Sequence, residues 1–229
     1  MKTHPAKLLS DRSSAVWSAI YCMALSAGQR SVRWGRHCLV VLVLPMLLAS
    51  CYLPEAFTID LSMERNGDYR LSYRGLLVQP NLTQGLLDNS VGPEEEQERV
   101  EKVLADLKRD SSVRQLTYAG RGVFNLVYEK RGNIMREKSF VFVRRQSRIL
   151  EMFFHKDRNI VEIRGGFVPD QYQDRLTALG YQMTGNIEVR TTAGVRSHNA
   201  AEFREISGQN RLRWEIKSIT DPVPNVILG

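Results

Sequence analysis

The chain has 229 residues, 43% of them hydrophobic and 25% charged, which suits one ordinary domain plus an appendage. Its formal net charge of +7 is unevenly distributed, because residues 1–51 hold six of the 32 basic and one of the 25 acidic side chains. The rest of the chain is nearly balanced. The overall charge therefore gives little support to nucleic-acid binding, and we expect no nucleic-acid partner.

Residues 38–48 form an uninterrupted apolar run. The run is too short for a membrane-spanning helix, which needs about 20 residues, but it fits the apolar region of a signal peptide. The basic segment that such a peptide requires precedes it, supplied by Arg30, Arg33 and Arg36. We predict a signal peptide over residues 1–50, with Met23 as an alternative translation start that gives a leader of more usual length.

The tetrad Leu48-Ala49-Ser50-Cys51 follows the apolar run and resembles the lipobox of bacterial lipoproteins. The resemblance implies that the Cys51 thiol receives a diacylglyceryl group and that cleavage falls between Ser50 and Cys51. A third acyl chain would then be added to the new amine, and two or three chains give stable anchoring where one is marginal. Two alternatives stay open, namely a signal peptide without lipid and a buried core helix over residues 38–48.

Cys51 is the last of three cysteines, so the predicted domain over residues 51–229 can form no internal disulfide and no cysteine-based zinc site. Residue 52 is tyrosine, whereas an aspartate there commonly retains lipoproteins of Gram-negative bacteria in the inner membrane. We therefore predict a protein held at a membrane of the cell envelope by lipid on Cys51. If the organism is Gram-negative, the periplasmic face of the outer membrane is favoured.

The expected elements begin with a β-hairpin, because apolar residues alternate over 57–63 and 69–73 around an Asn66-Gly67 turn. Residues 79–92 are expected to form a loop, with at most a short turn of helix. A helix over 93–109 follows, with acidic residues in its first turn and basic residues in its last. One apolar stripe runs along it, formed by Val100, Val103, Leu104 and Leu107.

Short alternating runs separated by turns predict an antiparallel meander after this helix. The expected strands span 113–119, 123–128, 140–143, 149–154 and 160–164, with turns at 130–133 and 156–159. A second helix over 170–179, strands at 186–191 and 212–219, and an extended tail at 222–224 complete the chain. The order predicts an α+β fold in which one antiparallel sheet, built from hairpin and meander, carries two amphipathic helices on one face.

Patterns of catalytic or metal-binding residues are missing from the sequence after Cys51. It holds two histidines, His155 and His198, far apart, and no nucleophile elbow, metalloprotease motif or phosphate-cradling glycine loop. Glu94–Glu96 are interpreted as a helix start matched to the helix dipole rather than a cation site. We predict that the protein is not an enzyme and has neither metal nor cofactor; a hydrolase of the envelope is the third hypothesis.

The strongest charge feature is the segment 131–164, with nine basic and four acidic side chains and four interleaved phenylalanines. If the basic side chains share one sheet face, that face could bind anionic lipid headgroups, peptidoglycan carboxylates or an acidic envelope protein. We place the centre of this surface at Arg144, Arg145 and Arg148. The alternative is that these are ordinary outward residues of amphipathic strands.

Two segments near the C-terminal end, 185–200 and 212–216, resemble the last part of the mycobacterial LppM-type lipoprotein domain. The shared features are a strand at 185–191, a Gly194-Val195 turn, an Asn199-Ala200 step and a Leu-x-Trp strand ending in Trp214-Glu215-Ile216. The opening hairpin with its Asn-Gly turn is similar as well. The resemblance implies an envelope lipoprotein with a small α/β domain and lipid or glycolipid binding, and it transfers no ligand residue.

The leading hypothesis is a non-catalytic envelope lipoprotein that binds an anionic lipid, a cell-wall component or an envelope protein. The second is a structural or assembly accessory that docks to an envelope complex through the apolar stripe of helix 93–109 or the tail Val223–Leu228. An apolar cavity large enough for an acyl chain would favour lipid binding, whereas a packed core would favour the accessory.

Overall fold

The computed structural model describes residues 52–144, 147–166 and 168–229. The predictions about the signal peptide, its cleavage after Ser50, the lipid on Cys51 and the role of Arg145 fall outside these residues. Within the described ranges, no helix has both the length and the apolar character needed to cross a membrane.

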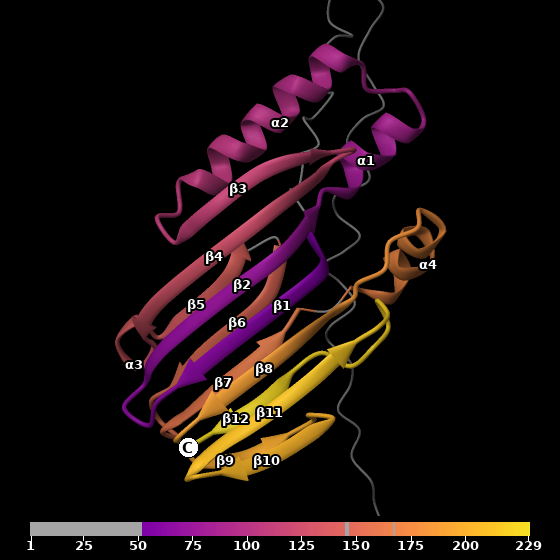
Figure 1. Ribbon diagram of the computed structural model, residues 1–229. Coiled ribbons are helices and arrows are strands. Elements are labelled where there is room, and N and C mark those ends of the chain that lie inside the picture. Colours follow the sequence, from indigo (N-terminus) through magenta and orange to yellow (C-terminus); the bar gives the residue numbers. More distant parts are fainter. Residues whose placement is uncertain (1–51, 145–146, 167) are drawn as a thin grey trace, which may run out of the picture. The chain divides into compact units, whose positions relative to one another are not determined.

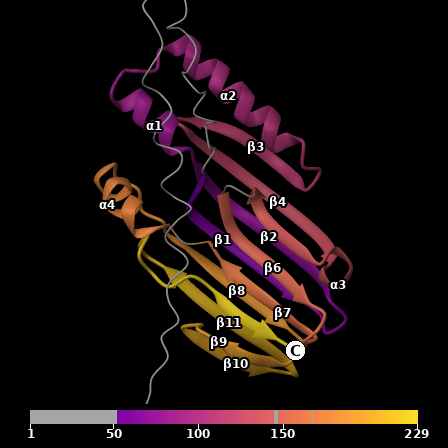
Figure 2. The same ribbon diagram turned by 180° about the vertical axis from the view of Figure 1, so that it is seen from behind.

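Most of the described residues form two β-sheets, which lie one behind the other (Figures 1 and 2). The first sheet has seven strands in the order β10-β11-β8-β1-β2-β4-β3. Its strands are β1 (Leu53–Met63), β2 (Asp68–Val78), β3 (Val113–Gly120), β4 (Val123–Asn133), β8 (Gly185–Thr191), β10 (Glu202–Ile206) and β11 (Gln209–Ile216). The sheet is mixed, because β8 runs parallel to β1 while the other neighbours are antiparallel.

The second sheet has five antiparallel strands in the order β5-β6-β7-β12-β9. They are β5 (Ser139–Arg144), β6 (Ser147–His155), β7 (Ile160–Gly165), β9 (Val195–His198) and β12 (Asn225–Leu228). The chain enters this sheet from β4 through the short helix α3 (Ile134–Glu137) and returns to the first sheet at β8. Short strands from the C-terminal part complete both sheets.

The main core lies between the two sheets. The alternating residues of β1 that face inward, among them Ile59 and Leu61, are fully buried. Phe142 of β5 packs across the interface, with its ring centroid 5.0 Å from that of Tyr73 on β2 and 4.7 Å from that of Tyr128 on β4. The period-two pattern therefore buries one face of each strand against the other sheet.

The longer helices lie beside the sheets. Helix α2 (Pro93–Lys108) runs along β3 (Figure 1) and buries Val100, Val103 and Leu107. Helix α1 (Pro80–Leu87) precedes it, directly after β2. Helix α4 (Asp170–Ala178) lies beyond the end of the strands at which β8 begins and β7 ends (Figures 1 and 2).

The prediction of an α+β fold and the hairpin of β1 and β2 are confirmed. The single antiparallel sheet is wrong, because the strands from β5 onward form a second sheet and β1 pairs in parallel with β8. The second sheet, rather than a pair of helices, covers the inner face of the first. The predicted turn at 130–133 belongs to β4, and the predicted loop at 79–92 contains α1.

Candidate functional site

A cavity with a volume of about 580 Å³ lies at the end of the two sheets where β1, β6 and β8 begin and β7 ends. Its size is within the range typical of small-molecule sites. Most of its lining is apolar, from Tyr52, Leu53, Pro54, Phe57, Pro80, Ile149, Val168, Pro169, Leu176, Leu179, Met183, Ile187 and Val223. The cavity is therefore suited to a long apolar group.

The first strand supplies one wall. A bulge interrupts the pairing of β1 with β2 between Glu55 and Thr58, and Ala56 within it has a φ of 45°. The bulge also contains Phe57, which lines the cavity and is 3% exposed. At Gly185 on the adjacent strand β8, an added Cβ would lie 2.6 Å from Phe57 Cδ1 and from Phe57 O, so glycine is required for the phenylalanine to pack there.

The end of β7 supplies the opposite wall through two glycines. A Cβ added to Gly166 would lie 1.4 Å from the carbonyl oxygen of Arg148, and Gly166 N donates to Ile149 O at 2.9 Å. A Cβ on Gly165 would lie 2.7 Å from the side chains of both Val223 and Pro224. These two residues must be glycine because β7 passes so close to the start of β6 and to the segment before β12.

Helix α4 covers the cavity with Leu176 and, after its last turn, Leu179. Tyr172 also lines the cavity, yet it is 50% exposed and is one of few large hydrophobic residues at the surface. Arg175 donates from Nη2 to Gln84 Oε1 of α1 and so links the two helices across the opening. An exposed aromatic side chain at a cavity rim is typical of a ligand-binding edge.

Charged side chains in the lining are mainly cationic. Arg148, Arg164 and Arg175 are exposed, and Glu151 is the acidic residue among them. Arg148 Nη1 lies 3.7 Å from Glu151 Oε1, and Arg164 pairs with Glu162, Nη2 to Oε1 at 2.5 Å. An apolar cavity with a cationic rim matches a ligand that has an apolar body and an anionic end.

Two of the three arginines that the sequence singled out, Arg144 and Arg148, are described by the structure and lie in different environments. Arg148 lines the cavity. Arg144, at the end of β5, is an internal contact: its Nε lies 3.2 Å from Asp106 Oδ2, and its Nη2 donates to Asp106 O at 2.6 Å. Arg145 is outside the described residues. Arg144 therefore ties β5 to α2, whereas Arg148 remains a candidate for ligand contact.

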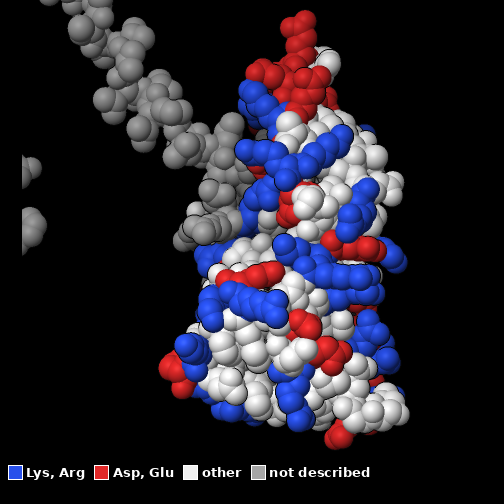
Figure 3. All heavy atoms as spheres, turned by 90° about the vertical axis from the view of Figure 1, so that its left-hand side faces the viewer, with Lys and Arg blue, Asp and Glu red and all other residues white. Residues whose placement is uncertain are grey.

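The wider basic segment 131–164 is also divided between the sheets. Arg131 lies on β4 of the first sheet, whereas Arg148 and Arg164 lie on β6 and β7 of the second. On the side shown in Figure 3, basic side chains recur over the surface with acidic ones beside them. This surface has mixed charge rather than one continuous basic patch. The cavity is therefore a better candidate for a ligand-binding site than the basic segment.

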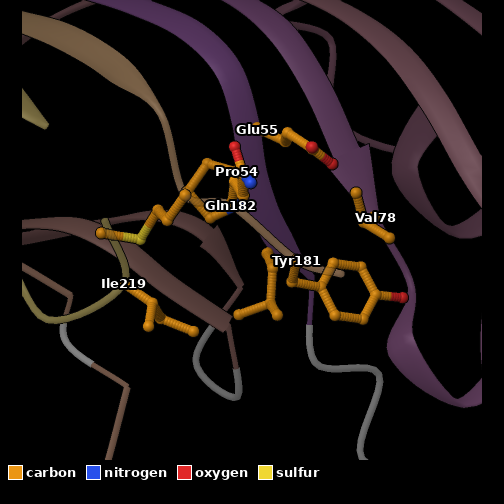
Figure 4. Close-up of a pocket in the computed structure, with 8 residues that line it drawn as sticks. Pro54, Glu55, Val78, Tyr181, Gln182 and Ile219 are labelled. Atoms are coloured by element: carbon orange, nitrogen blue, oxygen red, sulfur yellow. The ribbon is translucent and has the colours of Figure 1, made fainter. Parts of the chain in front are cut away.

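A second, much smaller hollow borders the cavity wall on β1 and is shown in Figure 4. Its volume is about 10 Å³, and Glu55, Val78, Tyr181 and Ile219 surround it. Burial raises the pKa of both the Glu55 carboxyl and the Tyr181 hydroxyl. A space of this size holds at most about one water molecule, so it is a packing defect rather than a ligand site.

Histidines do not contribute to the cavity lining in the described part of the chain. His155 Nε2 lies 3.0 Å from Glu162 Oε2 on the second sheet, and the His198 ring stacks on Phe203 at 4.9 Å. Among the described residues, no group of three or more metal-ligating side chains is found. The cavity thus brings together apolar and guanidinium groups.

Sequence reasoning located one cavity residue, Arg148, and missed the rest. Arg175 and Tyr172 belong to the predicted helix 170–179, but nothing in their spacing indicates a ligand. The structure assigns Gly165 and Gly166 to the cavity wall, and no ligand pattern in the sequence includes them. Tyr52 was considered only as the residue that follows the lipobox cysteine, although it too lines the cavity.

Comparisons with known proteins leave the family open. No protein-family model matches the chain, and no curated protein matches it. Among solved structures, the NMR structure of the LppM protein folded domain from Mycobacterium tuberculosis is similar, with a TM-score of 0.34 and 11% sequence identity. That match covers 77% of this chain and 91% of the LppM chain. Similarity at this level assigns no function.

Proposed function

We propose that the protein is a non-catalytic lipoprotein of the cell envelope, anchored by lipid on Cys51, whose cavity binds the acyl chain of an anionic lipid. The observation that carries this proposal is the apolar cavity of about 580 Å³ with three arginines in its lining. The lipobox resemblance implies the cell envelope as the compartment. Lipids are the abundant molecules there that combine an apolar body with an anionic end.

The apolar lining supports the acyl-chain part of the proposal. Each methylene group that leaves water for an apolar site contributes about 0.8 kcal/mol, so a chain of many methylene groups binds without any hydrogen bond. Leu176, Ile149 and Phe57 come from a helix and from both sheets, and they converge on the same space. A cell-wall sugar would need many more polar partners than this lining offers.

The rim supports the anionic part. Arg148 has a side chain that is 61% exposed, and its contact with Glu151 is a long one of 3.7 Å. Its guanidinium can therefore turn toward a phosphate at little cost, and arginine binds phosphate through two parallel hydrogen bonds. Arg175 lies across the opening, where its bond to Gln84 holds it in place.

The accessory hypothesis loses the two surfaces on which it depended. Val100, Val103 and Leu107 of α2 are buried within the domain itself. The tail contains β12, which pairs with β7 on one side and β9 on the other. Both segments are already used by the fold, so neither offers the docking surface that this hypothesis requires.

Lipid uptake by the full-length lipoprotein tests the proposal. We would measure binding of a fluorescent phosphatidylglycerol by the wild type and by two kinds of variant. Leu176→Trp fills the cavity, and the double variant Arg148→Glu/Arg175→Glu reverses the charge of the rim. We expect each to weaken uptake about tenfold or more, which corresponds to about 1.4 kcal/mol.

The matched control is the double variant Arg70→Glu/Arg204→Glu, which makes the same charge change at two exposed positions on β2 and β10 outside the cavity. It should leave uptake at the wild-type level. Equal uptake by the wild type and the Leu176→Trp variant, with both folded by circular dichroism, would exclude the cavity as the lipid site.

A further inference from the structure

The first described residue is part of the cavity wall. Tyr52 lines the cavity and is 3% exposed. Its backbone N–H donates to Ser147 Oγ at 2.7 Å, and Ser147 lines the cavity as well. This hydrogen bond joins Tyr52 to the first residue of β6, so the backbone at Tyr52 is fixed against the second sheet.

Cys51 is bonded directly to this fixed residue. Consecutive Cα atoms are about 3.8 Å apart across a trans peptide, so Cys51 is within one residue of the cavity wall whatever its conformation. A lipid on its sulfur would therefore start beside an apolar cavity of about 580 Å³. No spacer separates the anchor from the site.

We infer that the cavity houses one acyl chain of the protein's own lipid anchor whenever the anchor is outside a bilayer. The inference rests on the proposed function, since it requires both the lipid on Cys51 and a cavity that accepts acyl chains. In this inference, the first occupant of the cavity is an acyl chain of the lipid on Cys51. A free anionic lipid enters only after the protein's own chain has left.

The tether favours the protein's own chain over a free lipid. A free lipid loses its translational and rotational freedom on binding, whereas a chain attached beside the wall has already lost most of it. A short link also gives the attached group a high effective concentration, in the millimolar range for flexible linkers. A lipid dissolved at a lower concentration therefore cannot displace it easily.

The environment of the anchor decides whether the chain stays. In water, burying the chain in the cavity gains about 0.8 kcal/mol for each methylene group. In a bilayer the surroundings are as apolar as the cavity, so this gain disappears. Insertion of the anchor into a membrane thus empties the cavity and makes it available to a membrane lipid, with the rim arginines placed for its headgroup.

Photochemical crosslinking of the full-length lipidated protein tests this inference. A benzophenone amino acid replaces Tyr172, an aromatic residue that lines the cavity and is 50% exposed, or Leu179 as a second position should the first variant fail to fold. The same group at Phe203, 44% exposed on β10, is the control. Each protein is illuminated in detergent-free buffer and, separately, in vesicles of phosphatidylglycerol, and the peptides are identified by mass spectrometry.

In buffer we expect a crosslink from position 172 or 179 to the acyl chain on the Cys51 peptide, at least tenfold above the Phe203 control. In vesicles we expect phosphatidylglycerol adducts in its place. Phosphatidylglycerol adducts in vesicles without the internal crosslink in buffer would overturn this inference and leave the proposed function standing. Absence of lipid adducts under both conditions at both positions would overturn the two together.

Discussion

Arg144 Nε lies 3.2 Å from Asp106 Oδ2, and the two residues join the end of β5 to helix α2 across the boundary between the second sheet and the helix. Both side chains are roughly 70% buried, at 27% and 30% exposure. The contact assigns a structural role to a residue that the sequence placed at the centre of a binding surface. Arg148, four residues later, has the opposite character, since its side chain is 61% exposed at the cavity.

Replacing these two arginines should therefore separate stability from binding. We expect Arg144→Met to lower the free energy of unfolding by about 1–2 kcal/mol, because a partly buried carboxylate loses its charged partner. Arg148→Met should change it by less than about 0.5 kcal/mol and weaken lipid uptake instead. Urea titrations of the two variants measure the difference, and equal destabilisation by both would contradict the assignment.

The same contact predicts a dependence of stability on pH. Burial alone would raise the pKa of Asp106, but hydrogen bonds from Arg109 and Arg144 outweigh it and hold the pKa below its ordinary value. The ordinary value is about 3.9, so the stabilising contribution is complete above about pH 4 and is lost as the pH falls through the lowered value.

We expect the difference in unfolding free energy between the wild type and Asp106→Asn to be constant from pH 5 to 7, because Asp106 is ionised throughout that range. It should shrink progressively at more acidic pH. In an Arg144→Met background the difference should be smaller at every pH, since one of the two guanidiniums is gone. A difference that grew on acidification would have the wrong sign for this ion pair.

Gly166 should tolerate no side chain. Because an added Cβ would lie 1.4 Å from Arg148 O, Gly166→Ala must move the backbone of β6 or β7. We expect the free energy of unfolding to fall by about 1–3 kcal/mol or more, because the backbone must move to make room for the methyl group. Lipid uptake should also be impaired, because the strands that move form the cavity wall. Gly92→Ala is the control, since a Cβ there meets nothing within 4 Å. Thermal unfolding of both variants tests the comparison.

Asn199 connects the two sheets near the C-terminal end. Its Oδ1 accepts from the indole N–H of Trp214 on β11 at 3.0 Å and from the backbone N–H of Asn225 on β12 at 2.8 Å. Trp214 is 2% exposed, so its donor has little access to water. We expect Asn199→Ala to lower the free energy of unfolding by about 1–3 kcal/mol, because the buried indole N–H of Trp214 loses its acceptor. Asn186→Ala, an exposed change on β8, should be close to neutral by the same urea titration.

This contact also explains why two short motifs stood out in the sequence. The Asn-Ala step contains Asn199 and the Leu-x-Trp strand contains Trp214, and the structure shows that these residues are hydrogen-bonded to each other. The motifs were visible because a polar side chain and an indole occupy fixed positions. Their pairing was not, since nothing in a linear pattern states which residues 15 apart meet.

The periodicity of the sequence predicted where helices and strands lie better than it predicted which elements pair or pack together. The alternation of β1 shows that one face is buried, but it does not say whether a helix or a second sheet covers that face. Strands β9, β10 and β12 were missed because they have four or five residues, and β10 is largely exposed. The cavity draws its lining from many separate segments, so its existence could not be derived from the sequence, although Arg148 lay in the segment we selected.

The parallel pairing of β1 with β8 has a consequence for folding after export. Strand β1 lies in the middle of the seven-stranded sheet, yet its partner in register with Ile59 is Ile187, far along the chain. If the chain crosses the membrane from its N-terminal end, β1 and β2 can form their hairpin at once, whereas one edge of β1 stays open until residues 185–191 emerge. An unpaired apolar edge of this kind attracts other strands. A chain exported in this way would need protection from aggregation until residues 185–191 have crossed.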